Sequence, residues 1–384
     1  MKICERERCS GCSICSEVCP FGAVTMERDC EGFLRPVVDG EKCTECGLCK
    51  RKCPSNDSEN NPPTEVCAAY CKDKDIRARS SSGGIFSCLA EKILEDGGVV
   101  IGAGYGEGLR VVHKTAENKD ELLDLTGSKY VQSDTRGIYK KVGEYLKEKR
   151  TVLFSGTPCQ CAAVRNLYGE AEGLYLCDFI CHGVPTPELW KRFIGEEFTG
   201  AYGASFRDKK RGWQEFSMRV DAENGEYSCS QYKDPYLRMF LSNVCLRPSC
   251  YDCAQKGDNY SSDITLADFW GISKVFPEMN DDRGISVVIV RGEKGRGLFE
   301  SVKDGIVYKA CNVKSVARLN TAYGESAKRP ETRESFFEAL ADNKSFRELS
   351  REFGKPIGNK EIIKIRMKRW AKKLIARIYG LKNR

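Results

Sequence analysis

Two runs of cysteines near the start of the chain decide how that part folds. The first reads Cys9-Ser-Gly-Cys12-Ser-Ile-Cys15-Ser-Glu-Val-Cys19-Pro20, and the second reads Cys43-Thr-Glu-Cys46-Gly-Leu-Cys49-Lys-Arg-Lys-Cys53-Pro54. In each run three cysteines are separated by two residues, and a fourth, followed by proline, comes after three more. Three thiolates at this spacing can wrap one face of an iron–sulfur cubane, while the fourth points away from it.

The fourth cysteine of each run therefore belongs to the cluster of the other run. Disulfides explain the pattern poorly, because cysteines two residues apart do not readily pair along an extended run. Zinc needs four thiolates, usually from two pairs, and leaves the third and fourth cysteines of each run without a role. The sequence predicts two [4Fe–4S] clusters, one on Cys9, Cys12, Cys15 and Cys53, and the other on Cys43, Cys46, Cys49 and Cys19.

Composition indicates an intracellular protein with more than one domain. The chain has 384 residues, enough for two or three domains, and 22 cysteines. It has neither a leader-like start nor an apolar run near the length of a membrane span, so we expect a cytoplasmic location with reduced thiols. Residues 360–384 hold ten Lys or Arg and one Glu, a balance of +9, so the rest of the +7 chain sums to −2. No nucleic-acid partner is expected.

The order of patterns along the chain predicts an α+β protein. Residues 1–54 should form a small domain like a bacterial ferredoxin, and residues 55–65, which are polar, a linker. Residues 66–325 alternate between strand-like and helix-like segments, and residues 326–384 form a helical tail. The glycine-rich stretch at 99–108 leads straight into another strand, which favours a hairpin over a dinucleotide-binding turn and makes His113 a structural residue.

A second group of cysteines lies past this first domain. Cys159 and Cys181 each follow a buried strand, at the edge of an α/β sheet where ligands collect. Cys250 and Cys253 form a ligand-like pair, so we expect these four thiolates to hold a third [4Fe–4S] cluster, with Cys245 or Cys161 as substitutes. The remaining cysteines are interpreted as non-ligands, either in a turn (Cys30) or as small apolar residues: Cys67, Cys71, Cys88, Cys177, Cys229 and Cys311.

Several motifs between residues 66 and 310 resemble those of the coenzyme F420 hydrogenase and dehydrogenase beta subunit family. They are Ser82-Gly83-Gly84, Gly127-Ser128-Lys129-Tyr130, Gly156-Thr-Pro-Cys-Gln160, Cys181-His-Gly-Val-Pro185, Arg247-Pro-Ser-Cys250-Tyr-Asp-Cys253 and Asp263-Ile-Thr-Leu-Ala-Asp-Phe-Trp270. The resemblance implies a mixed α/β domain that binds FAD and iron–sulfur clusters, and it supports the four cysteines of the third cluster. It also implies flavin contacts at Ser82, Gly83, Gly84, Gly127, Ser128, Lys129 and Tyr130.

The expected function is that of an iron–sulfur flavoprotein oxidoreductase. Clusters transfer single electrons and a flavin exchanges hydride, so the protein would join a one-electron carrier or redox partner to an unidentified small-molecule substrate, with either direction of flow. Lys129 and His182 are the candidates for steering charge or protons near the flavin. The alternatives are a cluster-only electron-transfer subunit that docks onto another enzyme, and a zinc-bound scaffold.

The end of the chain has the pattern of an amphipathic helix. Lys and Arg lie opposite an apolar face, as in helices that rest on an anionic membrane surface. This would place the protein at the inner face of the membrane as a peripheral protein; the competing interpretations are a helix that docks on an acidic partner and a solvated end. The apolar face consists of Ile363, Met367, Trp370, Leu374 and Ile378.

Overall fold

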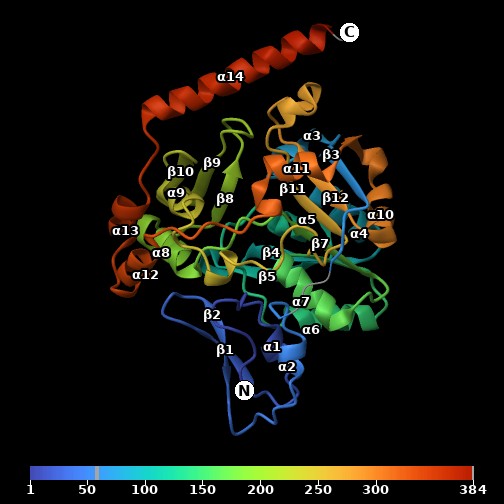
Figure 1. The fold of residues 1–384 in the computed structure, drawn as a ribbon, viewed down its shortest axis with the longest axis vertical. Coiled ribbons are helices and arrows are strands. Elements are labelled where there is room, and N and C mark those ends of the chain that lie inside the picture. The colour runs from blue at the N-terminus through green and yellow to red at the C-terminus, as the bar shows by residue number, and fades with distance from the viewer. Residues whose placement is uncertain (57–59, 383–384) are drawn as a thin grey trace.

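The N-terminal domain is a small unit built around a hairpin and two short helices. The computed structural model describes residues 1–56 and 60–382, and side chains up to residue 371. Strands β1 (Val24–Arg28) and β2 (Leu34–Val38) pair antiparallel, and α1 (Ile14–Glu17) and α2 (Leu48–Arg51) each form within one cysteine run. This domain forms one end of the molecule (Figure 1).

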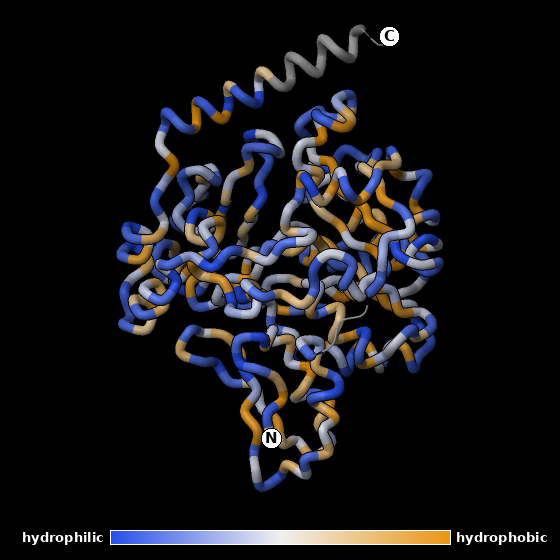
Figure 2. The backbone as a smooth tube through the Cα atoms, in the orientation of Figure 1, coloured by the Kyte–Doolittle hydropathy of each residue, from blue (hydrophilic) through white to orange (hydrophobic). Residues whose placement is uncertain are grey.

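An eight-stranded mixed sheet forms the centre of the protein. Strands β11, β7, β6 and β4 run parallel to one another, and their neighbours β12 and β5 are antiparallel to them. Beyond β12, the strands β3 and β13 also pair antiparallel. Several strands are mostly apolar, as expected for strands buried on both faces (Figure 2). In spatial order the sheet contains β13 (Ile306–Ala310), β3 (Glu65–Cys71), β12 (Ser286–Val290), β11 (Ile264–Asp268), β7 (Leu174–Phe179), β6 (Val152–Ser155), β4 (Val99–Tyr105) and β5 (Val111–Ala116).

Helices cover both faces of this sheet. Apolar side chains of α4 (Ile85–Glu95), α5 (Lys119–Leu125) and α10 (Gly292–Glu300) form the core on one face. On the other face lie α6 (Ile138–Lys147), α7 (Pro158–Tyr168) and α11 (Val313–Leu319). The short α3 (Lys74–Arg79) follows β3. Because the sheet is covered on both faces, the edge at the carboxyl ends of its parallel strands is left for binding.

A second layer packs beside the sheet. It contains an antiparallel sheet of β8 (Gly203–Asp208), β9 (Ser217–Ala222) and β10 (Gly225–Ser230). Helices α8 (Pro187–Glu197), α9 (Pro235–Leu241), α12 (Arg333–Ala341) and α13 (Phe346–Phe353) share an aromatic-rich core with these strands. The last helix, α14 (Asn359–Lys382), extends across the end of the molecule opposite the N-terminal domain (Figure 1).

The structure confirms the predicted α+β class. Helix α4 covers residues 85–95 as predicted, because Gly84 begins it in a left-handed conformation and Gly97-Gly98 follow its end. The glycine-rich stretch forms the antiparallel pair β4–β5, with a 3-10 turn (Glu107–Leu109) between them, so the hairpin interpretation was right. His113 lies on β5 and is buried, and it also lines a cavity at the carboxyl ends of the parallel strands.

Candidate metal centre and cofactor pocket

In the N-terminal domain, the fourth cysteine of the second run, Cys53, lies beside the cysteines of the first run. Burial, followed by the charges of Cys9 and Cys53, raises the pKa of the Cys15 thiol to about 12. Burial also raises the pKa of Cys12, and after burial the largest contribution to this rise comes from the charge of Cys53. Cys53 of the second run therefore lies beside the first three cysteines of the first run, which is the arrangement that the predicted ligand set requires.

The other predicted set faces outward. Burial raises the pKa of Cys49, and the charges of Cys19 and Cys43 add to this, so these three thiols are neighbours. Cys46 is exposed. A cluster held here would lie close to the protein surface, where a redox partner can approach it.

Cys4 was missed by the sequence analysis, because it precedes the first run. Hydrogen bonds with Cys53 and Cys9 raise the pKa of the Cys4 thiol, so it lies against two predicted cluster ligands. By contrast, Cys30 is exposed near the tip of the β1–β2 hairpin.

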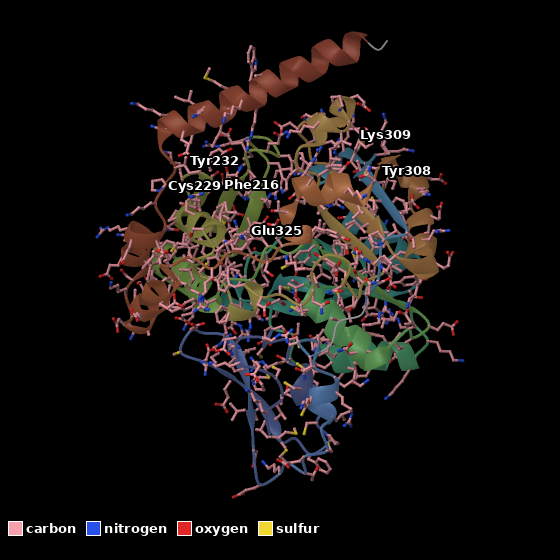
Figure 3. All side chains as sticks on the ribbon, viewed as in Figure 1. Phe216, Cys229, Tyr232, Tyr308, Lys309 and Glu325 are labelled. Atoms are coloured by element: carbon pink, nitrogen blue, oxygen red, sulfur yellow. The ribbon has the colours of Figure 1, made fainter. Side chains whose placement is uncertain are left out.

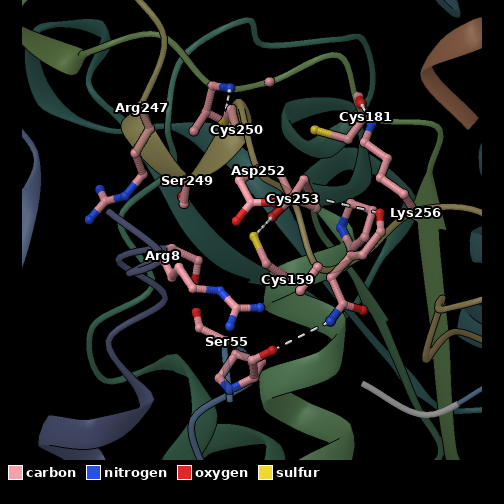
Figure 4. Close-up of a pocket in the computed structure, with 18 of the residues that line it drawn as sticks. Arg8, Ser55, Cys159, Cys181, Arg247, Ser249, Cys250, Asp252, Cys253 and Lys256 are labelled. Atoms are coloured by element: carbon pink, nitrogen blue, oxygen red, sulfur yellow. Dashed lines mark hydrogen bonds between the residues drawn. The ribbon is translucent and has the colours of Figure 1, made fainter. Parts of the chain in front are cut away.

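The structure also brings the four cysteines of the predicted third cluster to one cavity, which we call the cysteine pocket (Figure 4). Cys159 lies in the first turn of α7, directly after β6, and Cys181 follows β7. Cys250 and Cys253 come from a 3-10 turn (Pro248–Cys250) and the residues after it. The cavity has a volume of about 50 Å³, which suits a compact inorganic group better than an organic cofactor.

The four cysteines of the cysteine pocket are half-buried, and hydrogen-bond donors lie close to their thiols. Burial raises the pKa of Cys159 to about 11 and that of Cys250 to about 12. Thr157 Oγ1 lies 3.1 Å from Cys159 Sγ, and the Val184 N–H donates to Cys250 Sγ over 3.4 Å. Lys256 also lines the cavity, and its Nζ donates to the Cys181 carbonyl oxygen over 2.7 Å. Such donors and cations favour an anionic thiolate cluster.

Among the described residues, no three His, Cys, Asp or Glu side chains lie close enough together to hold one metal ion. In a cubane each thiolate binds a different iron atom, so the four sulfurs surround a wider space than the ligands of a single ion.

The two substitute cysteines do not line the cysteine pocket. Cys161 Sγ lies 3.9 Å from the Gly156 carbonyl oxygen and 3.8 Å from that of Cys177, inside the core. Cys245 is fully buried in the aromatic-rich core. The cysteines interpreted as small apolar residues also lie outside it; Cys229, for example, lies on β10 in the second layer (Figure 3).

A larger cavity, the loop pocket, lies at the carboxyl ends of the parallel strands and has a volume of about 270 Å³. Ser155 of β6, Phe179 of β7 and Asp268 of β11 line it. Six of the seven predicted flavin contacts also line it: Ser82, Gly84, Gly127, Ser128, Lys129 and Tyr130.

Gly83 is the exception among these predicted contacts. Its N–H donates to Ser286 Oγ over 3.0 Å, and a Cβ at this position would lie 2.5 Å from the Ala69 carbonyl oxygen. Gly83 therefore allows the loop to approach the sheet and does not itself line the pocket.

The loop pocket combines an uncapped helix end with an apolar wall. The N-cap of α4 is Gly84, which has no side chain, and within the described chain no side chain bonds to the first N–H groups of the helix. Such N–H groups attract phosphate. Ile85, Phe86, Leu125 and Leu266 supply the apolar wall.

Four titratable groups that line the loop pocket have shifted pKa values: His113, Lys129, Cys177 and Asp178. Burial lowers the pKa of Lys129 to about 7, although its Nζ donates to the carbonyl oxygens of Asp124 and Thr126, each over 2.8 Å. Burial raises the pKa of Asp178 to about 7. One oxygen of Asp178 accepts from Thr265 over 2.5 Å, and the other has no partner among the described residues.

Sequence reasoning missed the buried ion pair that supports this pocket. Arg207 Nη1 donates to Asp268 Oδ2 over 2.6 Å and to the Tyr130 hydroxyl over 3.2 Å. The Trp213 indole donates to Asp268 Oδ1 over 2.7 Å. No spacing rule could pair these residues, because they come from separate strands and loops.

The two predicted catalytic candidates lie in different cavities. Lys129 lines the loop pocket, whereas His182 lines the cysteine pocket. His182 Nε2 donates to Asn243 Oδ1 over 2.6 Å, and burial lowers the pKa of its imidazole. One residue, Thr157, lines both cavities, which are therefore neighbours.

Comparison with known families agrees with this arrangement. The C-terminal domain of the coenzyme F420 hydrogenase/dehydrogenase beta subunit matches residues 149–329, and the N-terminal domain of the same subunit matches residues 66–138. The chain belongs to the coenzyme F420 hydrogenase/dehydrogenase beta subunit family. A 4Fe-4S dicluster domain matches residues 8–56, so this family member carries an iron–sulfur electron-transfer domain at its N-terminal end.

A solved chain from the F420-reducing [NiFe] hydrogenase complex of Methanosarcina barkeri is similar to this family member. The two share 18% sequence identity over 68% of this chain and 88% of the other, with a TM-score of 0.49. None of the curated proteins matches the sequence. Within the described residues, no helix has the length and apolar character needed to cross a membrane.

Proposed function

We propose that this protein is an iron–sulfur flavoprotein oxidoreductase that passes electrons between a one-electron carrier and a hydride-exchanging substrate. The observation that carries the proposal is the position of Thr157, which lines the loop pocket and the cysteine pocket and lies 3.1 Å from Cys159 Sγ. A flavin in the first cavity and a cluster in the second would be separated by little more than this residue.

The N-terminal domain extends the same route toward the surface. Arg8 and Ser10, beside the first cysteine run, line the cysteine pocket. The charge of Cys159 also contributes to the raised pKa of Cys12, so the two predicted ligand sets are electrostatic neighbours. Beyond them lies the set with the exposed Cys46. We expect the one-electron carrier to dock there.

The residues of the loop pocket fit FAD. The N–H groups at the start of α4 are placed for a phosphate, and the apolar wall for a ring system. Bound FAD would supply the conversion between hydride and single-electron transfer. Lys129, whose pKa is about 7, can hold or release a proton beside it near neutral pH. His182 lies by the cysteine pocket, so we assign it to hydrogen bonding there.

Oxygen-free purification followed by iron, sulfide and flavin analysis tests the proposal. Three clusters would give about 12 iron atoms per chain, together with the absorbance of one flavin. Iron and sulfide without flavin, even after FAD is added, would support the alternative of a cluster-only electron-transfer subunit. A colourless protein that holds zinc would contradict both.

We also propose that α14 lies on an anionic membrane surface. One side of the helix docks on the body, where Ile362 is buried and Arg366 forms an ion pair with Glu215. On another side, Ile363, Met367 and Trp370 are 54%, 66% and 67% exposed. An exposed apolar stripe on a basic helix is typical of interfacial helices. The side chains of Leu374 and Ile378 lie outside the described residues.

A further inference from the structure

A fully buried arginine lies between the N-terminal domain and the cysteine pocket. Arg247 is 0% exposed. Its Nε donates to the Cys9 carbonyl oxygen over 2.7 Å, and its Nη2 donates to the Leu34 carbonyl oxygen over 2.6 Å. Its Nη1 donates to Gln132 Oε1 over 2.8 Å. All three acceptors are neutral.

Most buried arginines of this chain have a carboxylate partner, and Arg247 does not. A buried charge is costly unless an opposite charge lies close to it. Arg291, another buried arginine, feels the charge of Asp178, whereas Arg247 forms no ion pair with any residue that the structure describes. Five of the seven buried arginines form ion pairs: Arg35–Asp29, Arg77–Asp281, Arg165–Asp263, Arg207–Asp268 and Arg333–Glu31.

Two predicted cluster ligands, Cys9 and Cys250, also contact Arg247. Its Nη2 lies 3.8 Å from Cys9 Sγ. Its carbonyl oxygen accepts from the N–H of Cys250, over 2.9 Å, at the edge of the cysteine pocket. The Cys9 sulfur, when it is a thiolate, is therefore close enough to the guanidinium to act as its counter-charge.

The first cysteine run is shaped around this side chain. Gly11, between Cys9 and Cys12, has a φ of 64°, and a Cβ on it would lie 2.5 Å from Arg247 Nη1. Any other residue there would be strained and would displace the guanidinium. The chain thus keeps a place for Arg247 within the loop that would hold the cluster.

We propose that Arg247 supplies the positive charge that balances the cluster on Cys9, Cys12, Cys15 and Cys53, and that it raises the reduction potential of that cluster. Four thiolates outweigh the positive charge of the cubane, and reduction adds a further negative charge, so a fixed cation nearby favours the reduced form. Arg247 is a positioning residue, and the inference rests on the proposed clusters.

Redox titration of the whole protein, monitored by electron paramagnetic resonance, tests the inference. In Arg247→Met we expect the ratio of reduced to oxidised cluster at a fixed potential to fall about tenfold for one cluster, a shift of about 59 mV. Arg247→Lys, which keeps the charge, should shift it less. Arg333→Met is the matched control, because Arg333 is equally buried but has its own partner, Glu31; this variant should leave the potential unchanged.

Gln132→Glu tests the same charge without changing the arginine. A carboxylate placed 2.8 Å from Arg247 Nη1 would pair with it and should lower the potential of the same cluster, so this variant decides the matter if Arg247→Met does not fold. If Arg247→Met keeps its iron and its reduction potentials are unchanged, the proposed role of Arg247 is overturned. If Arg247→Met does not fold, unchanged potentials in iron-containing Gln132→Glu overturn it instead. Wild-type protein that lacks iron would instead overturn the proposed function.

Discussion

Lys129 is the residue through which we expect flavin binding to depend on pH. Burial holds its pKa at about 7, so the amine is cationic below that pH and neutral above it. FAD is an anion and should therefore bind more weakly at pH 8.5 than at pH 6. Lys129→Met should weaken binding at pH 6 by about tenfold, the loss of one charged contact. Flavin fluorescence during titration with FAD measures both effects.

Asp178 controls for this effect, because its pKa is also about 7 and its ionisation would repel the same anion. Asp178→Asn should therefore keep the part of the pH dependence that Lys129 supplies. A pH dependence that is unchanged in Lys129→Met would show that the lysine does not contact the flavin.

His113 makes the stability of the fold depend on pH. Its Nε2 donates to the Ser155 carbonyl oxygen over 3.1 Å and its Nδ1 lies 2.5 Å from Ser133 Oγ. Burial lowers its pKa from 6.5 to about 4. Between these values the unfolded chain binds a proton that the folded chain does not, so the free energy of unfolding falls as the pH drops below 6.5.

From pH 7.5 to pH 5 the loss from His113 should be about 2 kcal/mol. His113→Gln should remove this part of the pH dependence, which urea unfolding at the two pH values measures as a difference between variant and wild type. Equal losses in the two proteins would mean that His113 takes up its proton in the folded state.

At the scale of the elements, the sequence predicted those features that depend on residues close to one another in the chain. Helix α4 was predicted well because Gly84 and Gly97 lie next to its ends. The position of Cys159 and Cys181 at the sheet edge followed from the two strands that precede them. Arg247 could not be found in this way, because it bonds to a residue 238 positions away. The pairing of Arg207 with Asp268 also depends on the tertiary fold.

Helix α14 should bind anionic vesicles through its exposed stripe. In the double variant Met367→Ser, Trp370→Ser, sedimentation with vesicles of anionic lipid should fall at least about fivefold, because about 1 to 3 kcal/mol of apolar burial is lost for each side chain. Deletion of residues 360–384 should abolish it. Added salt should weaken the binding of the wild type.

Tyr202→Ser is the control for α14, because Tyr202 is 73% exposed but lies on another part of the surface. It should sediment with vesicles as the wild type does. If the double variant binds vesicles as tightly as Tyr202→Ser, α14 does not lie on the membrane. Binding to an acidic protein instead would identify a docking helix.

Across the whole molecule, the cysteine pocket lies between the loop pocket and the N-terminal domain. Cys253→Ser should therefore remove about four iron atoms per chain and disconnect the two ends. After reduction of the flavin by light with EDTA, the paramagnetic signal of the N-terminal clusters should appear at least about tenfold more slowly than in the wild type.

Cys161→Ser is the control for this experiment. Cys161 and Cys159 belong to the same helix, but the sulfur of Cys161 lies in the core and outside the cysteine pocket. The variant should keep its iron and its rate of electron transfer. If Cys161→Ser loses iron and Cys253→Ser does not, Cys161 is a cluster ligand and Cys253 is not.

The space beside Gly11 that the Arg247 guanidinium occupies has a consequence for building chimeras from this protein. The guanidinium that fills it comes from residue 247, in a different domain. A ferredoxin module grafted from elsewhere would need a glycine at the same place and a loop open enough to receive a foreign arginine. A module of this kind can therefore be exchanged only together with the arginine that packs into its loop.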